Sequence, residues 1–264
     1  MNFKNKIVLI TGASSGIGKQ TALEFAKKGA NLILVARRKD KLELVAKELE
    51  KFHTTILVCQ CDVSNKNQVK EMSKIVLEKF DTVDILVNNA GFAIFGAVSD
   101  LSIDDIESQM ETNYFGMIYC IKNFLPQMLK KKSGHIVNVA SVAASFGLPG
   151  IASYCASKFA MLGFSESLKH ELKDTGIGIT VVSPIMVRTN FFDHPSFEKI
   201  PKYSLMSLSS KSVANAILKA SSSPRLEIIV PSVVRGAVWT KNTFPYFINP
   251  LLGIFFKNMP NSKK

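Results

Sequence analysis

The sequence predicts a three-layer α/β fold: a doubly wound, parallel, seven-stranded sheet in a single domain. Short apolar runs rich in Val and Ile alternate with segments of helical periodicity, and no linker or low-complexity tract divides the 264 residues. Runs that are apolar throughout are typical of strands buried on both faces. Strands that alternate with helices predict a parallel sheet with helices on both sides.

The predicted elements follow one another in a regular order. We expect strands at 6–11, 31–36, 55–60, 84–87, 135–140, 178–182 and 227–230. Between them apolar residues recur every three or four positions, most clearly at 39–52 and 67–80, as on one face of a helix. Residues 186–208 break the pattern, and we expect a ligand-binding loop there. Residues 1–230 form the alternating part, and 231–264 a C-terminal segment of the same domain.

Composition excludes several classes of protein. With 47% hydrophobic and 20% charged residues, the chain is too apolar to be mainly disordered. The four cysteines, Cys59, Cys61, Cys120 and Cys155, are too few for a disulfide framework, so we expect buried thiols in a cytoplasmic protein. The N-terminal apolar run ends at Gly12, too soon for a signal peptide, and no run is long enough for a transmembrane helix.

Charge alone leaves three kinds of partner. The 33 Lys+Arg against 21 Asp+Glu give a formal net charge of +12, which suits nucleic acid, an anionic cofactor or a membrane surface. No groove-reading module or clustered basic helix is recognisable, so we expect no nucleic-acid binding. The 4 histidines lie far apart and lack ligand spacing, so we expect no metal site.

A glycine-rich turn follows the first predicted strand. The sequence TGASSGIG at 11–18 leads directly into a helical pattern. Glycines allow a tight turn and close approach of the backbone to a pyrophosphate, and the helix N-terminus offers free N–H groups. A turn without a ligand is the alternative, but the flanking strand and helix favour a dinucleotide site. The expected contacts are Gly12, Ser14, Ser15, Gly16, Ile17 and Gly18.

The end of the second predicted strand indicates which dinucleotide is bound. Sites for NAD usually carry an acid there that binds the ribose 2′-hydroxyl, whereas this chain has Arg37 and Arg38. Arginine pairs well with the 2′-phosphate that distinguishes NADP. We therefore expect NADP(H) to be preferred over NAD(H). A solvated basic start to the next helix is the alternative, and it explains Lys39.

A tyrosine and a lysine form a candidate catalytic pair. Tyr154 and Lys158 are four residues apart in a helical stretch, which places them on one helix face. A nearby ammonium group would lower the pKa of tyrosine from about 10 and make it a better acid–base group. Ser141 follows the predicted strand 135–140, where α/β sheets bind ligands, and its hydroxyl can hold a substrate oxygen for the tyrosine.

Taken together, these motifs resemble the short-chain dehydrogenase/reductase family over about residues 5–230. The matching motifs are TGASSGIG, Cys61-Asp62-Val63, Asn88-Asn89-Ala90-Gly91, Asn113, Ser141, Tyr154 and Lys158. The resemblance implies a Rossmann fold and an oxidoreductase that interconverts a ketone or aldehyde and its alcohol by hydride transfer. It also implies that Tyr154 is the general acid/base, that Ser141 orients the carbonyl or hydroxyl, and that Lys158 binds the nicotinamide ribose.

The same resemblance implies further site residues. Asn113 would hold a water of the proton relay, and Asp62 and Val63 would contact the adenine. The turn with Asn89, Ala90 and Gly91 would flank the adenine ribose. Two alternatives remain: Asn113 caps or bends a helix, and the Asn-rich segment is only a turn.

The nicotinamide contacts expected from the family's P-G-x-V-x-T segment are Pro184, Val187 and Thr189. Ile185 stands where the family has glycine. If that glycine needs a conformation open only to glycine, the loop must differ here.

Apolar residues predominate where the substrate should bind. We expect Phe92, Ala143 and Met186 to contact it beside Ser141 and Tyr154, which indicates a small lipophilic carbonyl compound or alcohol. Further apolar candidates in these segments are Ile94, Phe95, Ala144, Phe146, Phe191 and Phe192. Each of these side chains could equally be ordinary core. Arg188 and His194 are polar exceptions without an assigned role.

The C-terminal segment is aromatic and basic. From Arg225 to Lys264 there are six basic residues and one acidic residue, together with Trp239, Phe244, Tyr246, Phe247, Phe255 and Phe256. We expect Pro245 and Pro250 to break it into short pieces. It resembles the corresponding part of the 11β-hydroxysteroid-dehydrogenase-like branch. Peripheral membrane contact, a dimer interface and a cover over the substrate pocket are three open interpretations.

The leading hypothesis is an NADP(H)-dependent reductase or dehydrogenase of a lipophilic substrate, working as a homodimer or homotetramer. The alternative is a catalytically silent NADP-binding regulatory or scaffold protein. Such a protein would be expected to lack Tyr154 or Lys158, and this chain has both.

Overall fold

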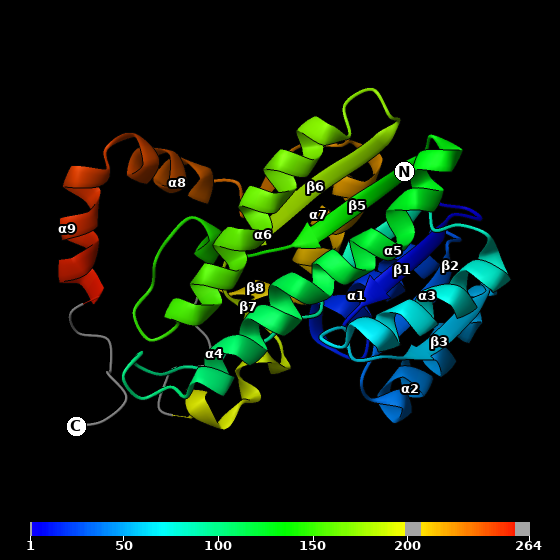
Figure 1. Ribbon diagram of the computed structural model, residues 1–264, viewed down its shortest axis with the longest axis horizontal. Coiled ribbons are helices and arrows are strands. Elements are labelled where there is room, and N and C mark those ends of the chain that lie inside the picture. Colours follow the sequence, from blue (N-terminus) through cyan, green and yellow to red (C-terminus); the bar gives the residue numbers. More distant parts are fainter. Residues whose placement is uncertain (1, 199–206, 257–264) are drawn as a thin grey trace.

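A parallel sheet of seven strands forms the centre of the computed structural model, which describes residues 2–198 and 207–256 (Figure 1). The strands are β1 (Ile7–Thr11), β2 (Asn31–Ala36), β3 (Ile56–Gln60), β4 (Ile85–Asn88), β5 (Gly134–Val139), β6 (Ile177–Pro184) and β9 (Glu227–Val230). All seven predicted strands are confirmed, with ends that differ by at most two residues. The order is β3-β2-β1-β4-β5-β6-β9, with every pair parallel.

Helices cover both faces of this sheet, as predicted. They are α1 (Gly16–Ala26), α2 (Lys39–Leu49), α3 (Lys66–Phe80), α4 (Ile103–Met110), α5 (Gly116–Lys131), α6 (Ala152–Glu171) and α7 (Ser210–Ser222). Val8 and Ile10 belong to the core that includes residues of α1, α2 and α7, whereas Leu9 belongs to the core with α3, α5 and α6. Successive side chains of a strand point to opposite faces, so one apolar strand supplies both cores.

The strand order determines where a ligand can bind. From β1 the chain continues to β2 and β3 on one side of the sheet. It then returns to β4, on the other side of β1, so the direction in which strands are added reverses between β1 and β4. Ligands of doubly wound sheets bind outside the carboxyl ends of the strands at such a reversal. Thr11 and Asn88 end the two strands that meet there.

The predicted loop at 186–208 begins and ends in paired backbone. Two short strands, β7 (Val187–Arg188) and β8 (Leu208–Ser209), pair in parallel, and two short 3-10 helices, η4 (Asn190–Asp193) and η5 (Pro195–Phe197), follow β7. Two-residue strands carry no periodicity, so the sequence could not predict them. Residues 199–206 of this loop lie outside the described residues.

The C-terminal segment forms two helices, α8 (Val234–Thr243) and α9 (Pro245–Phe256), which lie outside the three layers at the left of Figure 1. The expected break at Pro245 is confirmed, since it starts α9, a position that suits its fixed φ. The expected break at Pro250 is wrong, because this residue lies within α9, where the loss of one backbone hydrogen bond does not end the helix. None of the helices within the described ranges is long and apolar enough to cross a membrane.

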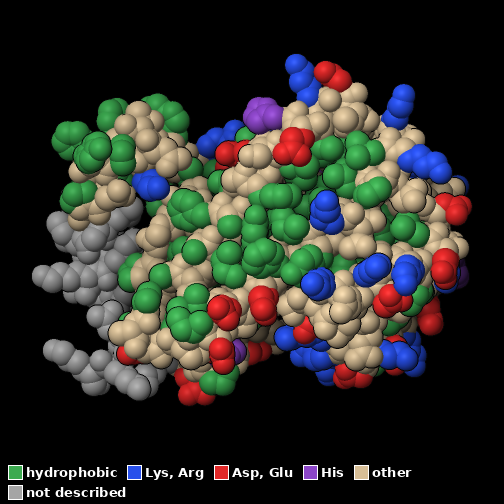
Figure 2. All heavy atoms as spheres, in the orientation of Figure 1, with side chains coloured by type: hydrophobic (Ala, Val, Ile, Leu, Met, Phe, Trp, Pro, Cys, Tyr) green, Lys and Arg blue, Asp and Glu red, His purple; other side chains and the backbone are tan. Residues whose placement is uncertain are grey.

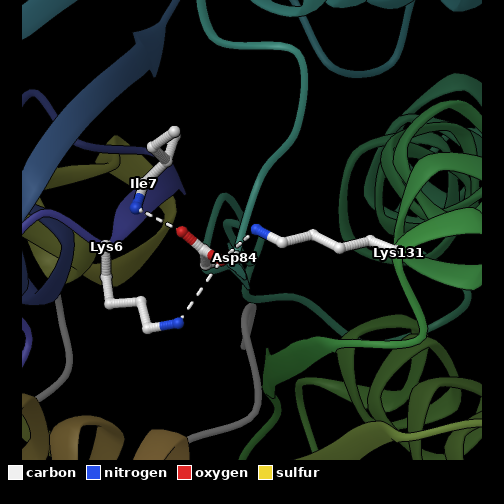
Figure 3. Close-up of polar contacts among 4 residues, drawn as sticks. All are labelled: Lys6, Ile7, Asp84 and Lys131. Atoms are coloured by element: carbon white, nitrogen blue, oxygen red, sulfur yellow. Dashed lines mark hydrogen bonds and ion pairs between the residues drawn. The ribbon is translucent and has the colours of Figure 1, made fainter.

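A buried carboxylate joins three elements at the end of the sheet opposite to the reversal (Figure 3). Asp84 precedes β4 and accepts hydrogen bonds from the backbone N–H of Ile7 (2.9 Å) and from Lys131 Nζ (2.9 Å) at the end of α5. Lys6 Nζ lies 3.5 Å from the same carboxylate. Burial raises the pKa of this carboxyl, but the hydrogen bonds and the two lysines outweigh burial and hold the pKa below its usual value.

We predict that Asp84→Asn lowers the free energy of unfolding at neutral pH by about 1–3 kcal/mol, because it leaves the Ile7 N–H and the two lysines without a charged acceptor. The folded pKa is lower than the unfolded value of about 3.9, so the stabilisation is complete above that value and is lost as the pH falls through the folded pKa. In urea unfolding, the difference in free energy of unfolding between wild type and Asp84→Asn should therefore become smaller from neutral pH to about pH 4 or below. Glu78→Gln, at an exposed position of α3, is the control, and an equal effect there would contradict the prediction.

Candidate active site

A cavity of about 1000 Å³ lies at the carboxyl ends of the central strands. The predicted residues that line it are Gly12, Ser14, Ser15, Gly16, Ile17, Arg37, Arg38, Asp62, Val63, Asn89, Ala90, Gly91, Phe92, Ser141, Ala143, Tyr154, Lys158, Pro184, Met186, Val187 and Thr189. Two predicted site residues, Gly18 and Asn113, are not among its lining residues. The structure therefore gathers most of the predicted site into one continuous cavity.

The glycine turn between β1 and α1 forms one wall. Gly12 and Gly16 have φ angles of 65° and 55°, a region that favours glycine. Ser15 is the N-cap of α1 but makes no side-chain capping bond, and no acid occupies the first helical turn. The N–H groups of that turn are thus available to an anion, as the chemistry of a pyrophosphate requires. A Cβ on Gly18 would collide with the carbonyl oxygen of Gly12, so this glycine permits close packing of the turn rather than lining the cavity.

The basic residues after β2 form the far end of the cavity. Arg37 and Arg38 line it, and no acid takes the position usual for NAD. Lys41 lines the cavity as well, a contact that the sequence analysis missed although it belongs to the same basic run. Lys39 is not among the lining residues. Its Nζ lies 3.8 Å from Glu43 Oε1, which agrees with the alternative that this lysine is a solvated residue at the start of the helix. The donors present at this end fit a phosphate monoester.

Hydrogen bonds hold the turn after β4 against the glycine turn. Thr11 Oγ1 accepts from the backbone N–H groups of Asn89 (2.9 Å) and Ala90 (3.0 Å). The Asn89 amide in return donates to the Thr11 carbonyl (2.9 Å). These bonds fix Asn89, Ala90 and Gly91 as a wall of the cavity, so the segment does more than reverse the chain.

Ser141, Tyr154 and Lys158 meet in the middle of the cavity. Ser141 Oγ accepts from the backbone N–H of Ala143 (3.1 Å), which fixes the hydroxyl just beyond the end of β5. Tyr154 and Lys158 lie in the first two turns of α6, and Lys158 Nζ lies 5.6 Å from the centre of the Tyr154 ring. The Lys158 side chain is only 3% exposed, and its ammonium group donates to the carbonyl of Val139 (3.0 Å).

Burial controls the proton affinities of this pair. It raises the pKa of the Tyr154 hydroxyl above its usual range, although a hydrogen bond with Ser141 opposes the change. It also lowers the pKa of Lys158 to about 7. Lys158 is not among the causes that shift the pKa of Tyr154 here, so the expectation that its ammonium group lowers this pKa stays a prediction. Tyr154 remains a protonated hydroxyl at neutral pH, suited to donate a proton.

Asn113 is buried beside the cavity rather than in its lining. It lies in η2 (Glu111–Phe115), a π-helical segment between α4 and α5, which supports the alternative that it bends a helix. Its amide accepts from the backbone N–H of Phe92 (2.9 Å) and donates to the carbonyl of Phe92 (3.0 Å) and to Ser157 Oγ (2.9 Å). The expected contact of Asn113 with a water of the proton relay stays a prediction. Asn113 positions the loop that carries Phe92.

The substitution of the family glycine by Ile185 causes no backbone strain. Ile185 is not among the described residues with a left-handed φ, so a β-branched side chain fits its conformation. Val187 and Thr189 still line the cavity, and a Cβ on Gly16 would lie 3.2 Å from the Thr189 side chain. The loop therefore still reaches the glycine turn.

The substrate end of the cavity is largely apolar. Phe92, Ala143 and Met186 line it as predicted, and the Phe191 ring lies 5.5 Å from the Tyr154 ring, centre to centre. Further apolar lining residues are Ala93, Leu148, Ile151, Phe192 and Phe197. Four other apolar candidates, Ile94, Phe95, Ala144 and Phe146, do not line the cavity and pack beside it. Loops have no regular side-chain periodicity, so the sequence does not show which of their residues face the cavity.

A buried amide that the sequence analysis did not single out secures the position of α6. Asn138, 0% exposed in β5, accepts from the Asn88 side chain (2.9 Å) and donates to Ser165 Oγ (2.9 Å) of α6. Its signal in the sequence is a polar residue in the apolar run HIVNVA. A buried amide must find partners, so Asn138 ties the helix that carries Tyr154 to the sheet.

Comparison with known proteins identifies the class to which the chain belongs. The family model described as short chain dehydrogenase matches residues 6–198. A dehydrogenase/reductase SDR family protein 7-like of Anopheles gambiae is 34% identical over 92% of this chain and 81% of its own length. A fatty acyl-CoA reductase of Acinetobacter baylyi is 36% identical over 99% of this chain and 88% of its own length.

Two solved structures share the fold. A short-chain dehydrogenase/reductase of Burkholderia phymatum in complex with NAD superposes with a TM-score of 0.86 at 26% identity, covering 94% of this chain and 96% of the other. An alcohol dehydrogenase of Thermococcus sibiricus with 5-hydroxy-NADP gives a TM-score of 0.77 at 29% identity, covering 86% and 96%. The chain belongs to the short-chain dehydrogenase/reductase family of nicotinamide-dependent oxidoreductases.

Proposed function

We propose that the protein is an NADP(H)-dependent oxidoreductase that reduces a lipophilic ketone or aldehyde to its alcohol. One observation carries the proposal. Ser141 and Tyr154 face the apolar end of a cavity whose opposite end presents Arg37 and Arg38, with no acid directly after β2. The cofactor needs anion-binding groups at one end and a proton donor at the other, and both are present.

When bound, the nicotinamide supplies the hydride to the carbonyl carbon. The chain's own residues handle the substrate oxygen: Tyr154 transfers its hydroxyl proton to that oxygen, and Ser141 donates a hydrogen bond to it as negative charge develops. Lys158 lies behind Tyr154, where its ammonium group favours the phenolate left after proton transfer. The aromatic wall around Phe191 keeps water from the reacting atoms.

The protonated form of Tyr154 is the one that carbonyl reduction uses. Burial raises the pKa of this hydroxyl and so favours that form over the phenolate.

The relatives support a lipophilic substrate without specifying it. The similarity to the Acinetobacter fatty acyl-CoA reductase extends over nearly the whole chain, including the C-terminal segment. A long acyl compound would find apolar contacts at Phe92, Met186 and Phe191. A catalytically silent NADP-binding protein is the alternative function, and the assembled Ser141, Tyr154 and Lys158 count against it.

We predict that Tyr154→Phe lowers kcat for NADPH-dependent reduction of lipophilic aldehydes and ketones by about 10²–10⁴-fold, because it removes the proton donor. The Kd for NADPH, measured by fluorescence titration, should stay within about threefold, since the ring and its packing remain. Tyr119→Phe, on α5 outside the cavity lining, is the matched control. Full activity of Tyr154→Phe would contradict the mechanism, and an inactive wild-type protein that binds NADPH would favour the silent alternative.

We predict that Arg37→Asp weakens NADPH binding by about 10–100-fold while NADH binding changes little, because a charge-assisted contact to the 2′-phosphate is lost. The solved relatives contain NAD in one case and 5-hydroxy-NADP in another, so this preference needs a direct measurement. Lys39→Asp makes the same charge change two residues away, outside the cavity lining. Equal losses for both cofactors, or an equal effect of Lys39→Asp, would refute the assignment.

We also propose that α8 and α9 contact an anionic lipid surface, which would bring the enzyme to lipophilic substrates. Trp239, Phe244, Tyr246 and Phe247 are exposed, the last two by 90% and 74%. From Pro231 to Lys264 the sequence has five basic residues and no acidic one, which complements an anionic surface. No described residue of this segment lines the cavity, so the pocket-cover interpretation lacks support. A homo-oligomer is a separate proposal. Figure 2 shows apolar side chains gathered over α5 and α6, and Leu129 and Phe159 are exposed apolar residues of these two helices.

We predict that the double variant Tyr246→Ser, Phe247→Ser loses most of its binding to vesicles of anionic lipid, because these side chains supply apolar contact with the bilayer. Trp239 is the single tryptophan of the chain, so its fluorescence should shift to the blue when wild-type protein meets such vesicles. Leu44→Ser, an exposed apolar residue on α2, is the control. If the double variant binds vesicles as the wild type does but has half the wild-type mass by light scattering, the segment is instead a dimer interface.

A further inference from the structure

A chain of hydrogen bonds runs through the loop at the substrate end of the cavity. The backbone N–H of Phe95 donates to Ser196 Oγ (2.9 Å). Ser196 Oγ lies 2.8 Å from His194 Nδ1, and the backbone N–H of Ser196 also points to that nitrogen, at 3.3 Å. His194 lines the cavity and had no role in the proposed function.

These contacts determine where the histidine carries its proton. A ring nitrogen that receives a backbone N–H must offer a lone pair, so Nδ1 of His194 is an acceptor. The Ser196 hydroxyl, which already accepts from Phe95, then donates its own proton to the same nitrogen. In the neutral imidazole the remaining proton sits on Nε2. His194 thus carries a hydrogen-bond donor as its second polar group.

Hydrogen bonds at Nδ1 and the packing of its neighbours restrict the His194 side chain. His194 caps η5 through Nδ1, and the following Pro195 starts that short helix. Phe95, whose N–H donates to Ser196, packs on the Phe197 ring, with ring centres 5.9 Å apart. A Cβ on Gly150, whose φ is 78°, would collide with the Phe95 ring. The loops after β4, β5 and β6 therefore all contribute to the position of His194, which limits its freedom before a ligand binds.

The surroundings of His194 define the ligand that would suit it. Phe191, Phe192 and Phe197 line the same end of the cavity. The neighbouring Asp193 lines the cavity too and accepts from the Asn190 side chain (2.7 Å), so a second carboxylate there would be repelled. His194 is exposed at this end of the cavity, and a donor there, beside aromatic rings and an acid, fits an uncharged acceptor such as an ester, thioester or amide carbonyl.

We propose that His194 forms a polar subsite that binds a second, uncharged carbonyl oxygen of the substrate, apart from the carbonyl that is reduced. The preferred substrate is then a lipophilic ketone or aldehyde that carries an ester- or amide-type group along its chain. This inference rests on the proposed function and adds to it a determinant of substrate choice. Ser196 is the positioning residue, since it acts on the substrate only through His194.

His194→Asn separates this role from helix capping. Asparagine is a good capping residue whose side-chain oxygen can accept from the Ser196 backbone N–H, but it lacks the ring and the Nε2 donor. His170→Asn, at an exposed position near the end of α6, is the matched control for loss of a histidine. Thermal unfolding of each variant checks that the fold is retained.

The test compares paired probes by NADPH oxidation. Methyl esters of oxo-alkanoic acids, in a series that varies the spacing between ketone and ester, are set against ketones of equal length without the ester. For the best-spaced ester, His194→Asn should raise KM and lower kcat/KM by about five- to tenfold, the effect of one lost hydrogen bond. Values for the plain ketone and for His170→Asn should change less than about twofold.

The possible outcomes separate this inference from the function on which it rests. Equal losses for ester and ketone would show a structural role for His194 and overturn the subsite alone. Unchanged kcat/KM of His194→Asn for both probes would also overturn the subsite. Turnover of neither probe by the wild-type protein would overturn the proposed function and the subsite together.

Discussion

Two backbone turns pack closely against each other at the centre of the site, and the cavity depends on this contact. The turn after β1 can approach the turn after β4 because Gly12 and Gly18 have no Cβ, which would collide with the neighbouring backbone or with Asn89. Thr11 and Asn89 then join the turns by hydrogen bonds of 2.9 Å. The N-terminus of α1 consequently faces the cavity with its N–H groups uncapped, which makes it an anion site.

The chemistry at the other end depends on how α6 is held against the sheet. Asn138 and Ser165 link β5 to α6 through buried hydrogen bonds, so Tyr154 and Lys158 enter the cavity at a defined depth. That depth removes them from solvent, which raises the pKa of Tyr154 and lowers that of Lys158 to about 7. The same packing that builds the site thus shifts the pKa of both groups.

Much of the fold was predictable because its signals are local. The apolar runs predicted all seven strands of the large sheet, whereas β7 and β8 are too short to show periodicity and form only where Met186 and Leu208 meet. Most predicted site residues line the cavity, since the ends of parallel strands meet at one edge. Gly18 and Asn113 act beside the cavity instead, through packing and through hydrogen bonds to Phe92 that residue type does not reveal.

The sequence by itself determined the fold class, the family and the chemical groups available: a glycine turn, a basic end without an acid, and a Ser, Tyr and Lys set. These follow from residue types at short spacings, which need no knowledge of distant contacts. The tertiary structure decided which side chains face the cavity and which way the proton affinities of Tyr154 and Lys158 move. Desolvation and hydrogen-bond partners set these properties, and both come from residues far apart in the chain.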